Sequence, residues 1–399
     1  MATYTCPYCF SQHEIYDVDF RCVNASCGME DDQPLTTYEG AAVPHKRNKV
    51  FPPQMKGFRF IAKKFMPAME RCPSCRTVSS FRLCPSCHNM LPPHIDDHED
   101  MIISIVGSRG SGKSHYIGVL IDELQKHIIP ELFGGNFMET DKSIRDQYMQ
   151  KYYYPLYQLG KPLDLTNPNE KQKPLIYETN IGEGNRVKHL TFIFYDTAGE
   201  NYEDLMTMTT VNKYICQSAG IIFLVDPSQV EEIRDNMDEK ILDEASNIPW
   251  QEIARSTPDA IIDRVARLIR QFRGMKPGKK IDIPVAVAFS KLDAIKELLP
   301  PGSMVAEPSG SIKSGRYDKD EARIIDEEMR TFLNTWGERR ITTAMKANFS
   351  NIAYFGVSAL GQSPQTAEGA GGARKIQKPR PERVEDPFLW LLYKTGVIK

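Results

Sequence analysis

Six short segments of this chain are rich in apolar residues, and most of them end at glycine or polar residues. They cover residues 101–106, 175–181, 189–195, 221–225, 284–289 and 352–357. Short, nearly continuous apolar runs are typical of strands that are buried on both faces of a parallel sheet. Residues 115–129 and 260–272 instead have the pattern of helices. The chain is therefore expected to form an α/β fold, with a mostly parallel sheet flanked by helices.

The first apolar run leads into the sequence GSRGSGKS, which fits the phosphate-binding pattern GxxxxGK[ST]. Its residues are Gly107, Ser108, Arg109, Gly110, Ser111, Gly112, Lys113 and Ser114. Glycines let the backbone curl around phosphates and direct several N–H groups inward, at the positive end of the following helix. In such a loop Lys113 reaches the β- and γ-phosphates, and the Ser114 hydroxyl binds Mg²⁺. We therefore expect this loop to bind a nucleoside triphosphate.

A second nucleotide motif, Asp196-Thr-Ala-Gly199, begins where the third apolar run ends. In nucleotide hydrolases the aspartate supports the Mg²⁺ shell, and the glycine offers its N–H to the γ-phosphate. A threonine between the first helix and this strand is expected to contact both Mg²⁺ and the γ-phosphate. The candidates are Thr140, Thr166 and Thr179. We favour Thr166 because it lies in a polar, proline-containing loop just before the second apolar run.

Two further motifs bear on the identity of the base. The fifth apolar run leads into Ser290-Lys291-Leu-Asp293, and the sixth leads into Ser358-Ala359. A carboxylate at Asp293 can accept from N1–H and from the exocyclic amine of guanine, whereas adenine has no donor at N1 and no amine at C2. Lys291 can lay its aliphatic stem along the base. The backbone of Ser358 and Ala359 can contact the guanine carbonyl, so the combination predicts a guanine nucleotide.

Eight of the nine cysteines lie before residue 90, in four closely spaced pairs. The pairs are Cys6 and Cys9, Cys22 and Cys27, Cys72 and Cys75, and Cys84 and Cys87. Two such pairs complete the four-sulfur tetrahedron that Zn²⁺ prefers, so we expect two closed, structural zinc sites. Joining the pairs in sequence order is the simplest arrangement, and interleaved pairing is the alternative. A redox-active dithiol and an iron–sulfur cluster are the less favoured chemistries.

The series GSRGSGKS, DTAG, SKLD and SA resembles the motifs of the Ras-like, translation-factor-related (TRAFAC) class of P-loop GTPases. The resemblance covers residues 100–363, about two thirds of the chain. It implies a Ras-like sheet, a GTP/GDP switch with Mg²⁺, two mobile switch segments and partners that recognise the GTP-bound form. With its cysteine-rich front, the chain also resembles GTPases of bacterial multi-gene conflict or defence systems.

Three positions depart from the pattern of that class. Ser290 stands where Asn or Thr is usual, which weakens the hydrogen bonding between this loop and the phosphate loop. Glu200 follows DTAG where Ras-like members have a water-positioning Gln, and a carboxylate can accept a hydrogen bond from water but not donate one. Arg109 adds bulk close to the γ-phosphate. With Lys113, Glu200 and Thr166 as catalytic candidates, we expect slow intrinsic hydrolysis.

Composition and charge narrow the classes of partner. The 399 residues are 41% hydrophobic and 26% charged, with a net charge of −2, which argues against a globally cationic nucleic-acid-binding protein. Residues 40–69 are basic and aromatic without an acidic residue. Nucleic acid or an acidic protein surface is a candidate partner there, and a solvated linker is the alternative. No signal peptide or membrane span is visible, so a cytoplasmic protein is expected.

The expected organisation has four parts. They are a double zinc-ribbon module at 1–95, a P-loop GTPase domain at 100–363, a flexible linker at 364–385 and a docking helix at 386–399. The favoured function is a GTP-binding switch with slow hydrolysis, whose zinc ribbons bind a protein partner. The alternatives are a non-catalytic scaffold stabilised by nucleotide, and a P-loop ATPase.

Overall fold

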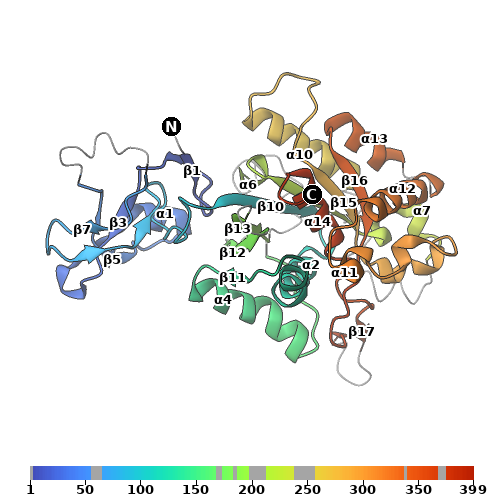
Figure 1. Ribbon diagram of the computed structural model, residues 1–399, viewed down its shortest axis with the longest axis horizontal. Helices are drawn as coiled ribbons and strands as arrows, with labels where there is room; N and C mark the ends of the chain where they lie inside the picture. The colour runs from blue at the N-terminus through green and yellow to red at the C-terminus, as the bar shows by residue number, and fades with distance from the viewer. Residues whose placement is uncertain are drawn as a thin grey trace. The chain divides into compact units, whose positions relative to one another are not determined.

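The computed structural model describes residues 3–54, 65–167, 173–182, 187–196, 213–237, 257–336, 339–366 and 374–399. The chain divides into two compact units, Met1–Asp100 and Met101–Lys399. Figure 1 draws the first unit in blue and the second in cyan to red. The boundary between the units lies between Asp100 and Met101.

The first unit consists mainly of short antiparallel strands (Figure 1), and buried cysteines belong to its core. Its central strand β3 (Asp19–Arg21) pairs on one side with β6 (Val50–Phe51) and on the other with β9 (Arg82–Leu83). Further elements are β1 (Thr3–Thr5) paired with β2 (Gln12–Glu14), β4 (Met29–Asp31) paired with β5 (Lys46–Asn48), β7 (Glu70–Arg71) paired with β8 (Val78–Ser79), the 3₁₀ turn Ala25–Cys27 and helix α1 (Gln33–Glu39). Five buried cysteines belong to the hydrophobic core. The same core also contains apolar side chains, among them Phe20 of β3 and Phe51 of β6.

A seven-stranded sheet forms the centre of the second unit, with the strand order β11-β12-β13-β10-β14-β15-β16. The strands are β10 (Glu99–Gly107), β11 (Phe137–Glu139), β12 (Leu175–Ile181), β13 (Lys188–Tyr195), β14 (Gly220–Val225), β15 (Val285–Phe289) and β16 (Ile352–Gly356). β10, β14, β15 and β16 are parallel neighbours, whereas β11, β12 and β13 pair antiparallel. Each of the six predicted runs forms a strand. β11 is an additional edge strand that the apolar pattern does not predict.

Helices cover both faces of this sheet (Figure 1). The helical segments are α2 (Lys113–Glu123), the π-helical η3 (Leu124–Ile128), α3 (Ile129–Phe133), α4 (Lys142–Tyr148), the π-helical η4 (Met149–Gln158), α6 (Lys213–Cys216), α7 (Glu231–Arg234), α10 (Pro258–Phe272), α11 (Gly310–Ser314), α12 (Lys319–Thr335), α13 (Arg339–Asn348), α14 (Asp386–Lys394) and the 3₁₀ turns Pro227–Gln229, Leu292–Ala294, Lys296–Leu298 and Met304–Ala306. Successive side chains of a strand point to opposite faces. Phe192 and Phe194 of β13 lie against Phe388 of α14, whereas Tyr195 stacks on Tyr214 of α6. None of the described helices combines the length and apolar character needed to cross a membrane.

The flexible linker predicted at 364–385 is a structured segment in its described parts. β17 (Gln365–Thr366) pairs with β18 (Arg374–Lys375), and Ile376, Arg383 and Val384 are buried. The Arg383 guanidinium is held by two carboxylates and two backbone carbonyls. Polar and backbone contacts of this kind leave no hydrophobic periodicity in the sequence, which explains the difference. The following helix α14 packs on β14 and β15.

Candidate nucleotide site and cysteine clusters

The phosphate loop connects β10 to α2 through a tight, glycine-dependent turn. The left-handed residues are Gly110 and Gly112, with φ of 73° and 87°. Inside the turn, the Ser111 hydroxyl donates to the Ser108 carbonyl oxygen at 2.9 Å. The buried Lys113 ammonium donates to the carbonyl oxygens of Gly107 at 2.9 Å and Ser108 at 2.7 Å. The lysine therefore lies inside the curl of the loop.

Three side-chain oxygens meet at the start of α2. The Ser114 hydroxyl lies 2.9 Å from Thr166 Oγ1 and donates to Asp196 Oδ1 at 3.0 Å. Hard oxygen ligands of this kind suit Mg²⁺. Thr179 instead lies within β12, and the Thr140 hydroxyl bonds to the backbone of that strand. Of the three candidate threonines, Thr166 is thus the one that contacts the phosphate loop.

The two motifs assigned to the base lie next to each other. The Ser358 hydroxyl donates to Asp293 Oδ1. Burial raises the pKa of Asp293, and the hydrogen bond from Ser358 acts against this shift. Lys291 has a left-handed backbone, with φ of 54°, and its ammonium donates to Asp226 Oδ2 at 2.5 Å. Asp226 directly follows β14, so the loops after three neighbouring strands meet at this edge of the sheet.

One pocket of about 490 Å³ joins the phosphate loop to the base motifs. Its lining includes Arg109, Gly110, Gly112, Lys113, Ser114, Thr166, Ser290, Lys291, Asp293, Ser358 and Ala359. Residues 161–165 and 360–364 form further parts of the wall, apart from Gly361. A pocket of this size accommodates a small-molecule ligand. Motifs from four distant parts of the sequence therefore surround a single cavity.

Gln229 holds the phosphate loop from outside its motif. The Ser108 hydroxyl donates to Gln229 Oε1, and Gln229 Nε2 donates to the Arg109 carbonyl oxygen at 2.7 Å. Gln229 lies outside every motif predicted from the sequence. Its signal was the polar sequence DPSQ directly after the apolar run 221–225, at the strand edge where the other loops converge.

His115 holds the segment that carries the candidate threonine. Its Nε2 accepts a hydrogen bond from the Leu163 N–H at 3.0 Å. Burial, reinforced by the positive charge of Lys291, lowers the pKa of His115 to about 4. The imidazole is therefore neutral at pH 7 and able to accept this bond. No sequence pattern identified this role, because the two partners lie far apart in the chain.

Gly199 and Glu200 lie outside the residues that the structure describes. The γ-phosphate contact of Gly199 and the catalytic role of Glu200 stay predictions. Asp196, the first residue of the same motif, is described and buried at the carboxyl end of β13.

The eight cysteines before residue 90 form two clusters. One contains Cys6, Cys9, Cys84 and Cys87, and the other contains Cys22, Cys27, Cys72 and Cys75, with all sulfur atoms of a cluster within 4.8 Å of one another. The closest pairs of sulfurs lie 3.5–3.8 Å apart, far beyond a disulfide bond. A Zn–S bond of about 2.3 Å gives tetrahedron edges of about 3.8 Å. Both clusters therefore fit Zn²⁺.

Joining the cysteine pairs in sequence order, the simplest arrangement, is wrong. β3 and β9 pair antiparallel, with Asp19 opposite Leu83. The chain before β3 and the chain after β9 therefore meet at one end of these strands, which brings the first and last cysteine pairs together. At the other end, the chain after β3 meets the chain before β9 and joins the two middle pairs. The interleaved alternative is not found either, because the pairing is nested: the first pair shares a cluster with the last, and the two middle pairs share the other.

Three of the four cysteine pairs have the same backbone turn. The residues that follow the second cysteine are left-handed, namely Phe10, Arg76 and His88, with φ of 58°, 62° and 51°. Each of them donates its N–H to the carbonyl of the first cysteine of its pair, at 2.8–2.9 Å. The His88 side chain is no part of the adjacent cluster, since its Nδ1 lies 2.6 Å from Asp32 Oδ1.

Strand β5 carries part of the basic segment 40–69, and acidic residues of β4 lie opposite it. Lys46 is paired in register with Asp31, and Arg47 with Glu30. Opposite charges across a strand pair offset each other. Residues 55–64 lie outside the described part of the chain. The described part of this segment therefore gives no support to a nucleic-acid site.

A phosphate loop followed by a serine, threonine and aspartate in contact, beside a pocket that also contains Asp293, is the arrangement of P-loop GTPases. Residues 101–371 match the family model for Double-GTPase 2. The chain belongs to this family.

Similarity to individual proteins is more distant. A Mycolicibacterium smegmatis protein named for ESX-1 scaffolding and assembly, SaeC, is 25% identical over 338 residues, which cover 79% of this chain and 80% of that protein. The Trypanosoma brucei Arl6 BBS3 small GTPase with bound GppNp is 13% identical, with 75% of this chain and 100% of that chain covered and a TM-score of 0.29. The Chaetomium thermophilum signal recognition particle receptor complex SRb-GTP/SRX is 12% identical, with 67% and 94% covered and a TM-score of 0.29.

Proposed function

We propose that this protein is a guanine-nucleotide switch of the translation-factor-related class, with slow intrinsic GTP hydrolysis. The observation that carries the proposal is the pocket that contains both the phosphate loop and Asp293. The Asp293 carboxylate accepts from N1–H and the amine of guanine, whereas adenine offers neither donor. Membership of the Double-GTPase 2 family supports the same assignment.

In this proposal Ser114, Thr166 and Asp196 hold Mg²⁺, which neutralises phosphate charge when bound. The close approach of their oxygens supports this role. Lys113 and the N–H groups of the loop bind the β- and γ-phosphates. Thr166 belongs to the segment that contacts the γ-phosphate, so loss of this phosphate releases it, and that change is the switch.

The cysteine-rich unit is proposed to hold two Zn²⁺ ions and to contact a protein partner. Four thiolates fill each tetrahedral site and leave no position for a reacting water, so the zinc is structural. The sulfur spacing in both clusters supports two ions for each chain. The family resemblance of the motifs supports a partner that recognises the GTP-bound form.

Displacement of a fluorescent GDP analogue, mant-GDP, tests the guanine assignment. We expect GTP to displace it at concentrations about a hundredfold or more below those of ATP, because a site built to accept two hydrogen bonds rejects a base that lacks the donors. Asp293→Asn should shift the preference toward xanthine nucleotides, since an amide donates to the additional carbonyl of xanthine. Equal displacement by GTP and ATP would contradict the assignment and favour a P-loop ATPase.

A scaffold that nucleotide only stabilises is the second candidate function. The relative SaeC is named for scaffolding and assembly, and Arg109 adds bulk beside the γ-phosphate position. Phosphate release from bound GTP separates the two candidates. We expect slow, measurable release that Lys113→Ala abolishes. Bound GTP without release, in the presence and absence of zinc and Mg²⁺, would favour the scaffold.

A further inference from the structure

The two oxygens of the Asp196 carboxylate have different partners. Oδ1 accepts from the Ser114 hydroxyl at 3.0 Å, on the side of the proposed Mg²⁺ site. Oδ2 accepts from the Tyr152 hydroxyl at 3.0 Å and lies 3.2 Å from the Lys151 ammonium. One oxygen therefore faces the phosphate loop, and the other is held by two consecutive residues of the segment η4.

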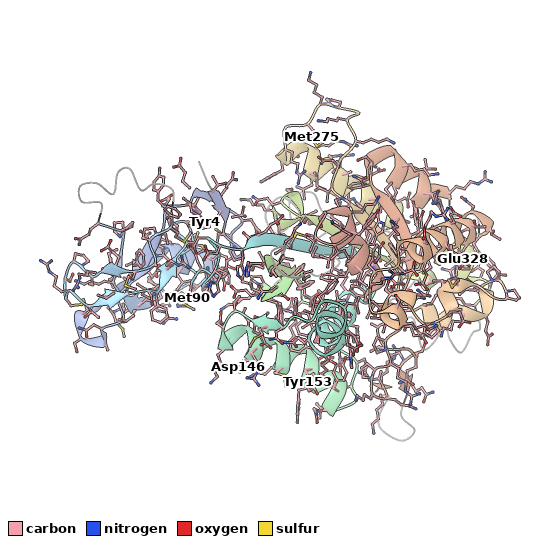
Figure 2. All side chains as sticks on the ribbon, viewed as in Figure 1. Tyr4, Met90, Asp146, Tyr153, Met275 and Glu328 are labelled. Atoms are coloured by element: carbon pink, nitrogen blue, oxygen red, sulfur yellow. The ribbon has the colours of Figure 1, made fainter. Side chains whose placement is uncertain are left out.

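The ring of Tyr152 is confined to one position. It lies on η4 beside Tyr153, which Figure 2 labels, and it is 1% exposed. It stacks on Tyr148, with ring centroids 6.0 Å apart. Tyr152 also packs against Gly118 of α2, where the space is so narrow that an added Cβ would lie 3.0 Å from the Tyr152 Cβ. Packing against α2 therefore sets the position of the Tyr152 hydroxyl relative to Ser114, which is on the same helix.

We propose that Tyr152 is a positioning residue for the Mg²⁺ aspartate. By holding Oδ2, its hydroxyl keeps Oδ1 of Asp196 directed at Ser114, whose own hydroxyl lies 2.9 Å from Thr166 Oγ1. A partner of this kind, which contacts the ligand rather than the metal, orients a metal-binding carboxylate and affects metal affinity. The inference rests on the proposed Mg²⁺-nucleotide function. The Lys151 ammonium lies beside Oδ2 of Asp196, and its positive charge weakens the binding of a cation by this carboxylate.

The variant Tyr152→Phe removes the hydroxyl and keeps the packed ring. The assay measures dissociation of mant-GDP from the full chain at a series of Mg²⁺ concentrations and in excess EDTA. We expect Tyr152→Phe to need about tenfold more Mg²⁺ for half-maximal retention. Its dissociation rate in EDTA should equal that of the parent, because the nucleotide contacts themselves are unchanged. A role in packing alone would instead raise the dissociation rate with and without Mg²⁺.

Tyr148→Phe is the matched control. Tyr148 is also buried in this helical region, and its hydroxyl donates to a backbone carbonyl, that of Gly118, at 2.9 Å. We expect this variant to retain the Mg²⁺ requirement of the parent. Equal Mg²⁺ requirements for Tyr152→Phe and Tyr148→Phe would overturn the positioning role.

A second variant tests the charge on the same oxygen. Lys151→Met, at a position where the side chain is 32% exposed, is expected to lower the Mg²⁺ requirement by about two- to fivefold, because a competing cation is removed. A raised requirement would contradict the charge role of Lys151. A parent protein that retains mant-GDP equally with Mg²⁺ and with EDTA would contradict the proposed Mg²⁺ site, and one that retains none would contradict the proposed function.

Discussion

Gln229 bonds to the phosphate loop, a contact that the resemblance to the GTPase class would assign to a different residue. In that class the residue at the position of Ser290 ties the base loop to the phosphate loop. Here the Ser290 hydroxyl donates to the Val225 carbonyl at 3.3 Å. Gln229, which follows the same strand β14, bonds both to the Ser108 hydroxyl and to the Arg109 carbonyl. The amide thus holds the third position of the phosphate loop from the neighbouring strand end.

Gln229→Leu should therefore weaken nucleotide binding. Two hydrogen bonds of about 1 kcal/mol each are lost, so we expect the Kd for GDP to rise about thirtyfold. Titration of the variant with mant-GDP measures this change. Gln125→Leu is the control, because Gln125 donates to the Phe137 carbonyl and to Glu139 in the same unit but not to the loop. Equal Kd values for the two variants would contradict the assignment.

The C-terminal strap, residues 374–384, joins two walls of the nucleotide pocket. Ser358 and Glu382 exchange two backbone hydrogen bonds, at 2.8 and 2.9 Å, and the Arg380 N–H donates to the Leu360 carbonyl at 3.0 Å. At its other end, the Ile376 N–H donates to the Gly160 carbonyl at 2.8 Å. Gly160 directly precedes the pocket segment 161–166. The strap therefore connects the base loop to the segment of the candidate threonine.

Gly160→Ala should loosen this connection. Gly160 has φ of 58°, and a Cβ there would lie 2.7 Å from the Ile376 carbonyl oxygen, so the strap must shift. We expect GDP to dissociate about three- to tenfold faster, a change equivalent to the loss of about one hydrogen bond. Stopped-flow measurement of mant-GDP release in EDTA tests this.

Gly274→Ala provides the control for backbone strain. Gly274 has φ of 57°, nearly the same as Gly160, and a Cβ there would have no atom within 4 Å. Both substitutions impose the strain of a left-handed alanine, but only Gly160→Ala also displaces the strap. Release rates that rise equally in both variants would show that strain, and not the strap, controls the nucleotide.

At the scale of the whole molecule, the two units hold separate chemistry. All residues that line the nucleotide pocket belong to Met101–Lys399, and both cysteine clusters belong to Met1–Asp100. The nested pairing makes the first unit depend on contacts between its two ends, because Cys9 and Cys84 share a cluster. Loss of either residue should therefore affect the same metal site.

Zinc content of double variants tests the nested pairing. Cys9→Ser with Cys84→Ser should remove about one Zn²⁺ for each chain, whereas Cys9→Ser with Cys22→Ser should remove about two, because each site needs all four thiolates. Sequential pairing predicts the reverse. Both proteins should keep the parent affinity for mant-GDP, since the pocket lies in the other unit.

Most of the sheet and most of the nucleotide motifs were predictable from sequence. Buried strands are visible in the sequence as apolar runs. The phosphate loop is formed by consecutive residues, so a short sequence motif identifies it. The edge strand β11 was not predictable, because three residues are too few to show an apolar run or an alternation of apolar and polar positions. The ordered strap was missed because backbone hydrogen bonds and the ion pairs of Arg383 hold it, and neither leaves a hydrophobic signal.

The sequence by itself determined the apolar strands, the phosphate loop and the number of cysteine pairs, because each depends on residues that are neighbours in the chain. Only the tertiary structure decided which distant groups meet. Three contacts depend on how the loops and η4 pack beside one edge of the sheet. They are the contact of Thr166 with Ser114, the hydrogen bond from Gln229 to the Arg109 carbonyl and the hydrogen bond from Tyr152 to Asp196. The cysteine partners depend on the antiparallel pairing of β3 with β9. Such pairings arise from long-range packing, which local patterns do not encode.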